Sequence, residues 1–145
     1  NDAPSTINRL MNMGIEPFLV ATSVNLICAQ RLVRRVCKDC KQPQQVPVKA
    51  LIDIGFTPED AKSATIMKGR GSPTCNNTGY KGRCGLFEVL ELSEDLREMI
   101  LTGCSALELR RRAIEEGMIT LRQSGLIKIK AGVTSIDEVC RETVF

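Results

Sequence analysis

Four of the seven cysteines lie in a loop-rich stretch where their spacing could hold a metal ion. The Cys37-x-x-Cys40 pair lets both sulfurs face one ion, while backbone N–H groups of the turn support the thiolates. The second half of such a site is expected near Cys75, inside the glycine-rich stretch SPTCNNTGYKGRCG, residues 72–85. A tetrahedral thiolate site for zinc can clamp two distant loops that have few apolar residues of their own. We therefore predict a structural zinc site in residues 37–84.

Two other uses of these residues fit the pattern less well. A redox Cys-x-x-Cys pair usually opens a helix after a strand, whereas Cys40 is followed by Pro43 and Pro47. The glycines at positions 79, 82 and 85 lack the G-x-G-x-x-G spacing of a phosphate-binding loop and precede an expected strand. They are expected to permit tight turns instead. Structural metal binding remains the favoured chemistry.

The composition argues against several functional classes. The 145 residues include no histidine, so histidine can serve neither as a base nor as a ligand, and no G-x-x-x-x-G-K-[ST] phosphate loop occurs. A formal net charge of +3 and an aromatic content of 3% give little support for a nucleic-acid partner. No apolar run is long enough to span a membrane, and the opening NDAPST does not resemble a signal peptide. We expect a cytoplasmic chain that is a fragment of something longer.

The elements that would position the cysteines can be placed from local signals. Residues 2–14 are expected to form a helix, and a second, buried helix is expected after Pro17, with Cys28 in its core. The stretch RLVRRVC, residues 31–37, is predicted to be a strand, and GLFEVLEL, residues 85–92, the returning strand. Between them we expect irregular structure with one short helix near residues 58–64. The metal-binding segment is thus predicted to be an insertion between two strands.

The remainder, residues 93–145, has repeated helix start and stop signals. Ser105-x-x-Glu108 and Ser135-x-x-Glu138 match capping boxes, and Ser93 precedes two acids. Glycines at positions 103, 117 and 132 are expected to end helices. We predict a small C-terminal helical bundle and, for the whole chain, an α+β fold that is mostly helical.

Three stretches of the sequence have specific residues in a specific order. They are NDAPSTINRLMNMGIEPFLVATSVNLICAQRLVRRVCKDCK, CNNTGYKGRCGLFEVLEL and AIEEGMITLRQSGLIKIKAGVTSIDEVCRET. Together they resemble the C-terminal part of the secretion ATPases, the motors of type IV pilus assembly and type II secretion. The resemblance covers essentially the whole chain. Because the family's retraction motors generally lack the tetracysteine insertion, Cys37 and Cys40 indicate an assembly or secretion motor.

This resemblance implies a RecA-like ATPase that acts as a homo-hexameric ring at the cytoplasmic face of the inner membrane, where it moves a platform protein. Residues 1–36 would be the end of the ATPase core, 37–84 the tetracysteine zinc-binding insertion, and 85–145 the returning strand and helical bundle. ATP and Mg²⁺ would be bound by the parent protein, whose Walker elements would lie upstream. This fragment alone is therefore expected to be inactive. Gln30 and Arg31 match a family stretch near the nucleotide and are weak candidates for sensing it.

One departure from the family pattern affects the metal site. The family commonly has a second Cys-x-x-Cys, which would fall at positions 72 and 75, but position 72 is Ser72. Either the fourth ligand has moved or the site has three thiolates. Because Cys84 offers a soft anionic ligand and Gly79 and Gly82 can fold the chain back toward Cys75, we predict the set Cys37, Cys40, Cys75 and Cys84, with Ser72 outside it.

Two other functional classes remain as alternatives. The segment 37–84 could be a zinc-ribbon-like module that binds nucleic acid through Arg31, Arg34 and Arg35, although the low aromatic content and small net charge argue against this. The chain could also be a purely structural interaction domain. We predict no nucleic-acid partner.

Overall fold

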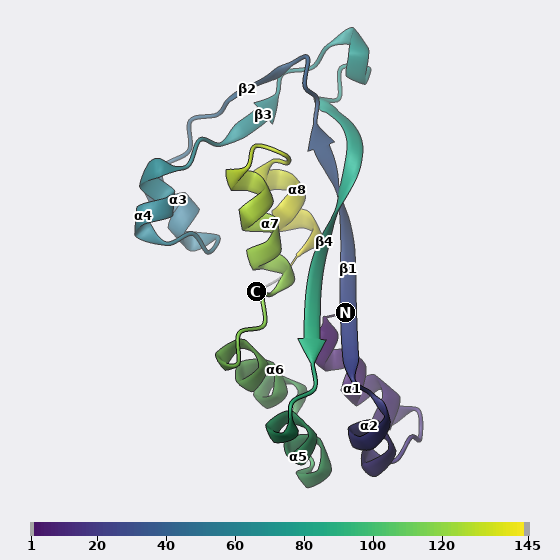
Figure 1. Ribbon diagram of the computed structural model, residues 1–145. Coiled ribbons are helices and arrows are strands. Elements are labelled where there is room, and N and C mark those ends of the chain that lie inside the picture. Colours follow the sequence, from purple (N-terminus) through teal and green to yellow (C-terminus); the bar gives the residue numbers. More distant parts are fainter. Residues whose placement is uncertain (1, 144–145) are drawn as a thin grey trace. The chain divides into compact units, whose positions relative to one another are not determined.

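The computed structural model describes residues 2–143 and has an α+β fold, as the sequence predicts, with helices as the more abundant elements (Figure 1). The helices are α1 (Ala3–Asn12), α2 (Pro17–Ser23), α3 (Val48–Asp53), α4 (Pro58–Ser63), α5 (Glu94–Thr102), α6 (Ala106–Glu115), α7 (Leu121–Lys130), α8 (Ile136–Glu142) and the 3₁₀ helix η1 (Pro73–Cys75). The strands are β1 (Leu26–Val36), β2 (Lys41–Pro43), β3 (Met67–Gly69) and β4 (Tyr80–Glu91). β1 pairs with β4, and β2 pairs antiparallel with β3, so that Lys41 lies opposite Gly69.

The chain folds as two compact units, each built from two separate stretches. Unit 1 comprises residues 1–30 and 87–120, and unit 2 comprises residues 31–86 and 121–145. Both β1 and β4 contribute residues to each unit. The predicted boundaries after residues 36 and 84 both fall inside unit 2, so the loop-rich segment 37–84 is part of a larger unit that also includes α7 and α8.

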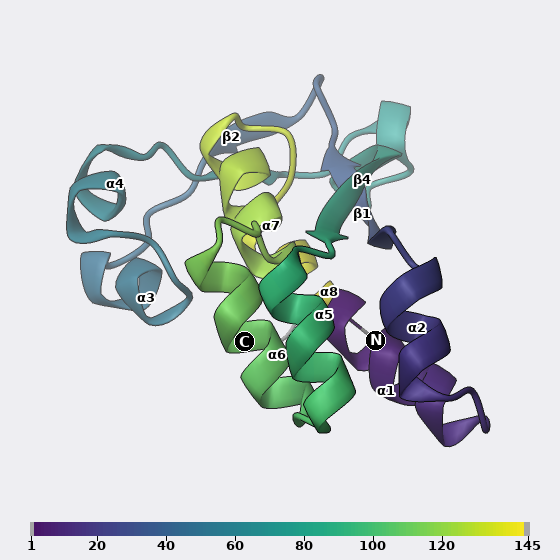
Figure 2. The same ribbon diagram turned by 60° about the horizontal axis from the view of Figure 1, so that its bottom comes forward.

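Unit 1 is a group of four helices packed against the end of β4. Figure 2 shows α1, α2, α5 and α6 of this unit, in which α1 contacts α2 and α6, and α5 contacts α2 and α6. Its core includes Ile7 of α1, Val20 of α2, Ile100 of α5, Leu109 of α6 and Leu90 of β4. The amphipathic pattern of each helix therefore places one apolar face in a shared core.

Two carboxylates fix the start of α1 within unit 1. The Asp2 carboxylate accepts the Ser5 N–H at 2.9 Å, and the Ser5 hydroxyl oxygen accepts the Asp2 N–H at 3.2 Å. The buried Glu88 of β4 accepts the Ala3 N–H at 2.7 Å. These acceptors satisfy N–H groups that have no partner within the helix, and their negative charge interacts favourably with the helix dipole.

Unit 2 packs α3 and α4 of the loop-rich segment with α7 and α8. Its core includes Leu51, Phe56, Ile129 and Val139, all buried. Gly125 of α7 permits close packing with α8, because a Cβ atom at this position would lie 2.4 Å from Val139 Cγ1. This apolar core, and not the cysteines alone, holds the loop-rich segment in place.

Glu138 joins α8 to β1 within unit 2. Its carboxylate is 1% exposed and accepts the Arg34 backbone N–H at 2.8 Å, the Arg34 guanidinium at 2.7 Å and the Arg141 guanidinium at 2.7 Å. The Arg34 guanidinium also lies 4.2 Å from the centre of the Tyr80 ring. The Tyr80 hydroxyl is 2.6 Å from the Ser135 hydroxyl. A buried carboxylate with this many donors is a strong link between elements distant in sequence.

The structure corrects the predicted second helix. α2 ends at Ser23 and β1 begins at Leu26, so Cys28 is an exposed residue on a strand and not part of a helical core. The polar Asn25 interrupts the apolar run, and from Leu26 onward partly buried residues alternate with exposed ones, with Ile27 partly buried. This period of two is the pattern of a half-buried strand.

The four C-terminal helices do not share one core, contrary to the predicted bundle. α5 and α6 belong to unit 1, whereas α7 and α8 belong to unit 2. The predicted starts are confirmed, since the hydroxyls of Ser93, Ser105 and Ser135 each accept an N–H from the first turn of a helix. Capping is local, so the sequence predicts where each helix begins but not which neighbour it packs against.

Candidate metal centre

Two turns of unit 2 hold the candidate metal ligands. The first follows β1 and contains Cys37 and Cys40, and the second is η1, which ends at Cys75. All three side chains are buried, and their sulfur atoms lie within 4.8 Å of one another. Cys40 Sγ is 3.7 Å from Cys75 Sγ. The structure thus brings together three of the four predicted ligands.

The two turns are held together by their backbones. The Cys37 N–H donates to the Gly79 carbonyl at 2.9 Å, and the Arg70 N–H donates to the Cys40 carbonyl at 3.0 Å. A Cβ atom at Gly69 would lie 2.0 Å from the Gly79 carbonyl oxygen, and Gly79 itself has a φ of +83°. Only glycine fits both positions without displacement, so these glycines permit the close approach that brings the thiols together.

Hydrogen-bond donors surround one of the three sulfurs. The backbone N–H groups of Ser72 and Gly79 each donate to Cys75 Sγ at 3.3 Å, and the Ser72 hydroxyl lies 3.5 Å from it. The Ser72 hydroxyl first, and then these N–H groups, lower the pKa of Cys75 to about 6 against the opposing effect of burial. Burial raises the pKa of Cys40. The lowered pKa favours the thiolate form of Cys75, which is the form that binds a cation.

Zn²⁺ fits this donor set. Among the described residues, no carboxylate joins the group, and its three sulfurs are soft ligands of the kind that favour Zn²⁺ over Mg²⁺ or Ca²⁺. The ligands come from two turns about 35 residues apart, and all are buried. Bound metal would cross-link the turns and supply folding energy. Nothing in this arrangement calls for a catalytic role.

The structure does not bring Cys84 to the group, which differs from the predicted ligand set. Cys84 is half-buried on β4, and its sulfur is not among the three that lie within 4.8 Å of one another. The turn at Gly79 leads directly into this strand. Ser72, which the sequence-based prediction leaves outside the ligand set, lies beside the sulfurs. Its hydroxyl oxygen is 3.8 Å from Cys37 Sγ.

The weak nucleotide-sensing candidates lie next to each other on β1. Gln30 is exposed and is the last β1 residue of unit 1, whereas Arg31 is half-buried and is the first of unit 2. Consecutive side chains of a strand point to opposite faces. The Gln30 and Arg31 side chains therefore lie on opposite faces of β1.

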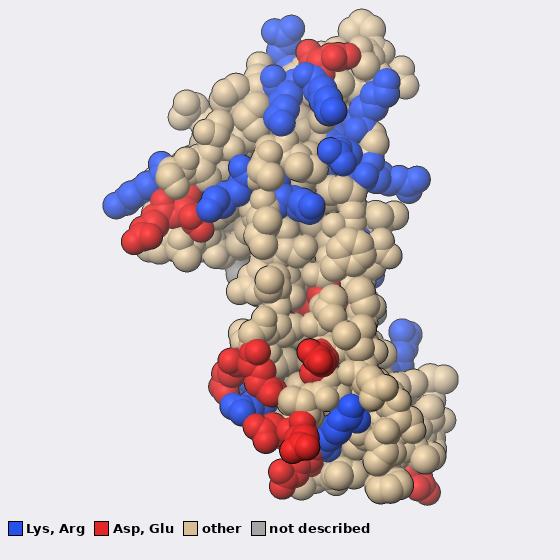
Figure 3. Space-filling view, viewed as in Figure 1, with Lys and Arg blue, Asp and Glu red and all other residues tan. Residues whose placement is uncertain are grey.

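The charges of the chain are divided unequally between the units. Unit 2 holds 15 Lys and Arg against 7 Asp and Glu, a formal charge of +8, whereas unit 1 holds 5 against 10, a formal charge of −5. On the face drawn in Figure 3, blue side chains are abundant over unit 2 and red ones over unit 1. The net charge of +3 conceals this division, because the −5 of unit 1 cancels part of the +8 of unit 2.

Cationic side chains of unit 2 also line a hollow beside the cysteine group. It has a volume of about 300 Å³ and is lined by Arg35, Val36, Cys37, Lys38, Asp39, Thr74 and Lys81. Of the three arginines proposed for nucleic-acid binding, Arg34 is bound to Glu138 and stacks on Tyr80. Its partners reduce the number of arginines available to phosphates.

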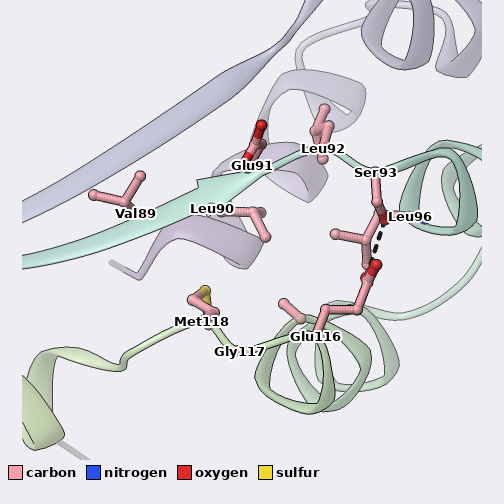
Figure 4. A pocket seen from close by; sticks show the side chains of 10 residues that line it. Val89, Leu90, Glu91, Leu92, Ser93, Leu96, Glu116, Gly117 and Met118 are labelled. Atoms are coloured by element: carbon pink, nitrogen blue, oxygen red, sulfur yellow. Dashed lines mark hydrogen bonds between the residues drawn. The ribbon is translucent and has the colours of Figure 1, made fainter.

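Unit 1 has a hollow of its own, of about 340 Å³, between the end of β4 and α6 (Figure 4). Its lining is apolar at Leu90, Leu96 and Met118 and acidic at Glu91 and Glu116. The Ser93 hydroxyl donates to Glu116 at 3.0 Å at its edge. Carboxylates at this position would repel phosphates, so the hollow is a poor nucleotide site.

Among the described residues, no helix is both long and apolar enough to cross a membrane.

Comparison with known proteins gives the family. The profile of the family described as "Type II/IV secretion system protein" matches residues 1–141. The chain is 48% identical over 99% of its length to the type IV pilus assembly ATPase PilB of Myxococcus xanthus, of which it covers 25%. It is 45% identical to PilB of Acinetobacter baylyi, covering 25% of it, and 40% identical to type II secretion system protein E of Dickeya dadantii, covering 28% of it, in both cases over 99% of this chain. The chain thus spans about a quarter of the length of these relatives.

Proposed function

Because this chain belongs to the type II/IV secretion system protein family, we propose that it is the C-terminal, zinc-stapled portion of an ATPase motor that powers type IV pilus assembly or type II secretion. The observation that carries the motor assignment is the match over 99% of the chain to relatives named as pilus assembly ATPases. Pilus assembly comes first of the two because those relatives reach 48% and 45% identity, against 40% for the secretion protein.

In this proposal the parent protein binds ATP and Mg²⁺ through residues outside this chain. The parent forms a homo-hexamer at the cytoplasmic face of the inner membrane and acts on a platform protein there. Residues 1–36 end a RecA-like core, in which either Gln30 or Arg31 senses the nucleotide. The formal charges of −5 on unit 1 and +8 on unit 2 support association of the hexamer's subunits through charged surfaces. Charged contacts of this kind suit an interface that forms reversibly.

The metal has a structural role in this proposal. Three buried thiols within 4.8 Å of one another support this role, since structural zinc sites are built from cysteine sulfurs grouped around one ion. Cys37, Cys40 and Cys75 would hold the ion and thereby fix the two turns that end β1 and begin β4. Rigid turns there keep the strand pair in register for force transmission.

The test uses the full-length parent protein. Wild type is expected to hydrolyse Mg-ATP and to contain zinc, and Cys40→Ser is expected to lose the zinc and to assemble or turn over less well. Cys28→Ser is the matched control, because Cys28 is exposed on β1 and outside the group. Absence of ATP turnover in the parent would contradict the motor assignment, whereas full turnover and unchanged zinc in Cys40→Ser would contradict the metal's role.

A further inference from the structure

Three thiols leave one position of a tetrahedral zinc site to be filled. Taking the metal proposed above as the premise, we propose that the Ser72 hydroxyl oxygen is the fourth donor. The site is then a three-sulfur, one-oxygen centre in which Cys84 takes no part. This makes Ser72 a ligand-determining residue that distinguishes the chain from a four-cysteine centre.

The distances match a tetrahedron with one oxygen corner. Zn–S bonds of about 2.3 Å put sulfurs about 3.8 Å apart, and a Zn–O bond of about 2.0 Å shortens a sulfur–oxygen edge to about 3.5 Å. In the structure, Cys40 Sγ and Cys75 Sγ are 3.7 Å apart. Ser72 Oγ lies 3.5 Å from Cys75 Sγ and 3.8 Å from Cys37 Sγ. These three edges are close to those of such a tetrahedron, and they place the hydroxyl near its fourth corner.

The local fold holds Ser72 in this place. It is the N-cap residue of η1, its N–H donates to Cys75 Sγ at 3.3 Å, and its carbonyl accepts the Asn77 N–H at 2.8 Å. Ser72-x-x-Cys75 also has the spacing of Cys37-x-x-Cys40. The two turns thus present their donors in equivalent pairs, and serine stands where the fourth thiol of such a site would be.

An oxygen corner changes the properties of the centre. A serine hydroxyl is a harder and weaker donor for zinc than a thiolate. With three thiolates the bound centre has a net charge of −1, instead of the −2 of a four-thiolate centre. The ion is therefore held less tightly and exchanges faster than in a four-cysteine site. The lysines and arginine of the adjacent hollow face a smaller negative charge.

Cobalt(II) substitution tests the donor set directly, since its visible and near-ultraviolet bands report the number of thiolates. Wild type should give the shorter-wavelength visible bands of a mixed sulfur–oxygen site, with about three quarters of the thiolate charge-transfer intensity of Ser72→Cys. Zinc competition with a chromogenic chelator should show Ser72→Cys binding at least about tenfold more tightly, and Ser72→Ala at least about tenfold more weakly.

Cys84→Ser is the control and should match wild type in spectrum and affinity. A wild-type spectrum identical to that of Ser72→Cys, or unchanged affinity in Ser72→Ala, would overturn the proposal. Loss of one thiolate band component in Cys84→Ser would assign the corner to Cys84 instead. Failure of every variant, Ser72→Cys included, to bind cobalt or zinc would refute the metal site itself, which separates that failure from failure of the Ser72 assignment.

Discussion

Replacing Glu138 with Gln is expected to destabilise unit 2 by about 3 kcal/mol, the lower end of the range for breaking a buried ion pair. The Glu138 carboxylate is 1% exposed and accepts the Arg34 N–H, the Arg34 guanidinium and the Arg141 guanidinium. The amide keeps the shape but loses the charge, and its NH₂ group faces donors. The lower end applies because the Arg34 and Arg141 side chains are 42% and 56% exposed, so water recovers part of their hydration.

Urea unfolding of the zinc-loaded chain, followed by circular dichroism, measures this loss. The control is Asp60→Asn, which removes an exposed ion pair with Lys130 at 2.9 Å and should cost less than about 1 kcal/mol. A loss in Glu138→Gln no larger than that of the control would refute the view that Glu138 links α8 to β1.

The difference in unfolding free energy between wild type and Glu138→Gln should depend on pH with a definite sign. Burial disfavours the charged carboxylate, but the hydrogen bonds and charges of Arg34 and Arg141 outweigh it and hold the pKa of Glu138 below its ordinary value of 4.5. A lowered folded-state pKa means that the stabilisation is present above about pH 4.5 and is lost as the pH falls through the folded pKa. The stability gap between wild type and Glu138→Gln should therefore narrow below that pH. A gap that stays constant from pH 7 to pH 3 contradicts this account.

Three further predictions concern the loops, the nucleotide and nucleic acid. Gly69→Ala should push the two turns apart, because its Cβ would lie 2.0 Å from the Gly79 carbonyl oxygen. It should weaken zinc binding, measured by chelator competition, at least about tenfold, whereas the control Gly82→Asn should not weaken it. The 145-residue chain alone should not hydrolyse Mg-ATP, since it has no phosphate loop, and phosphate release above background would contradict this. At physiological salt, labelled DNA should show no saturable anisotropy change when the chain is added, despite the +8 charge of unit 2, because Arg34 and Tyr80 are engaged with each other. A micromolar binding isotherm with a steep dependence on salt would restore the nucleic-acid alternative.

Local signals in the sequence predicted local structure well. The serine caps at positions 93, 105 and 135 begin helices where expected, and α4, which Thr57 caps, lies where one short helix is predicted. The signals failed where structure depends on distant partners. Cys28 was assigned to a helix because apolar residues surround it in sequence, whereas pairing of β1 with β4 makes it an exposed strand residue. The same limitation hid the division of the C-terminal helices between two units.

The sequence predicts that three of the cysteines lie together, but not which residue lies beside them. The spacing of Cys37 and Cys40 and the glycines near Cys75 identified three thiols that the structure gathers. Ligand softness favours Cys84 over a hydroxyl as the fourth ligand. In the structure Gly79 lies against Gly69, the chain continues as β4, and Ser72 lies beside the sulfurs.

The most direct test of the central claim is the zinc content of the purified chain combined with hydrogen exchange before and after chelation. We expect one zinc ion per chain and faster exchange, on chelation, in the turns at residues 37–43 and 69–80, with α1 and α5 unchanged, because their core in unit 1 does not involve the cysteines. A chain without zinc, or one whose turns exchange at the same rate after chelation, would contradict the account.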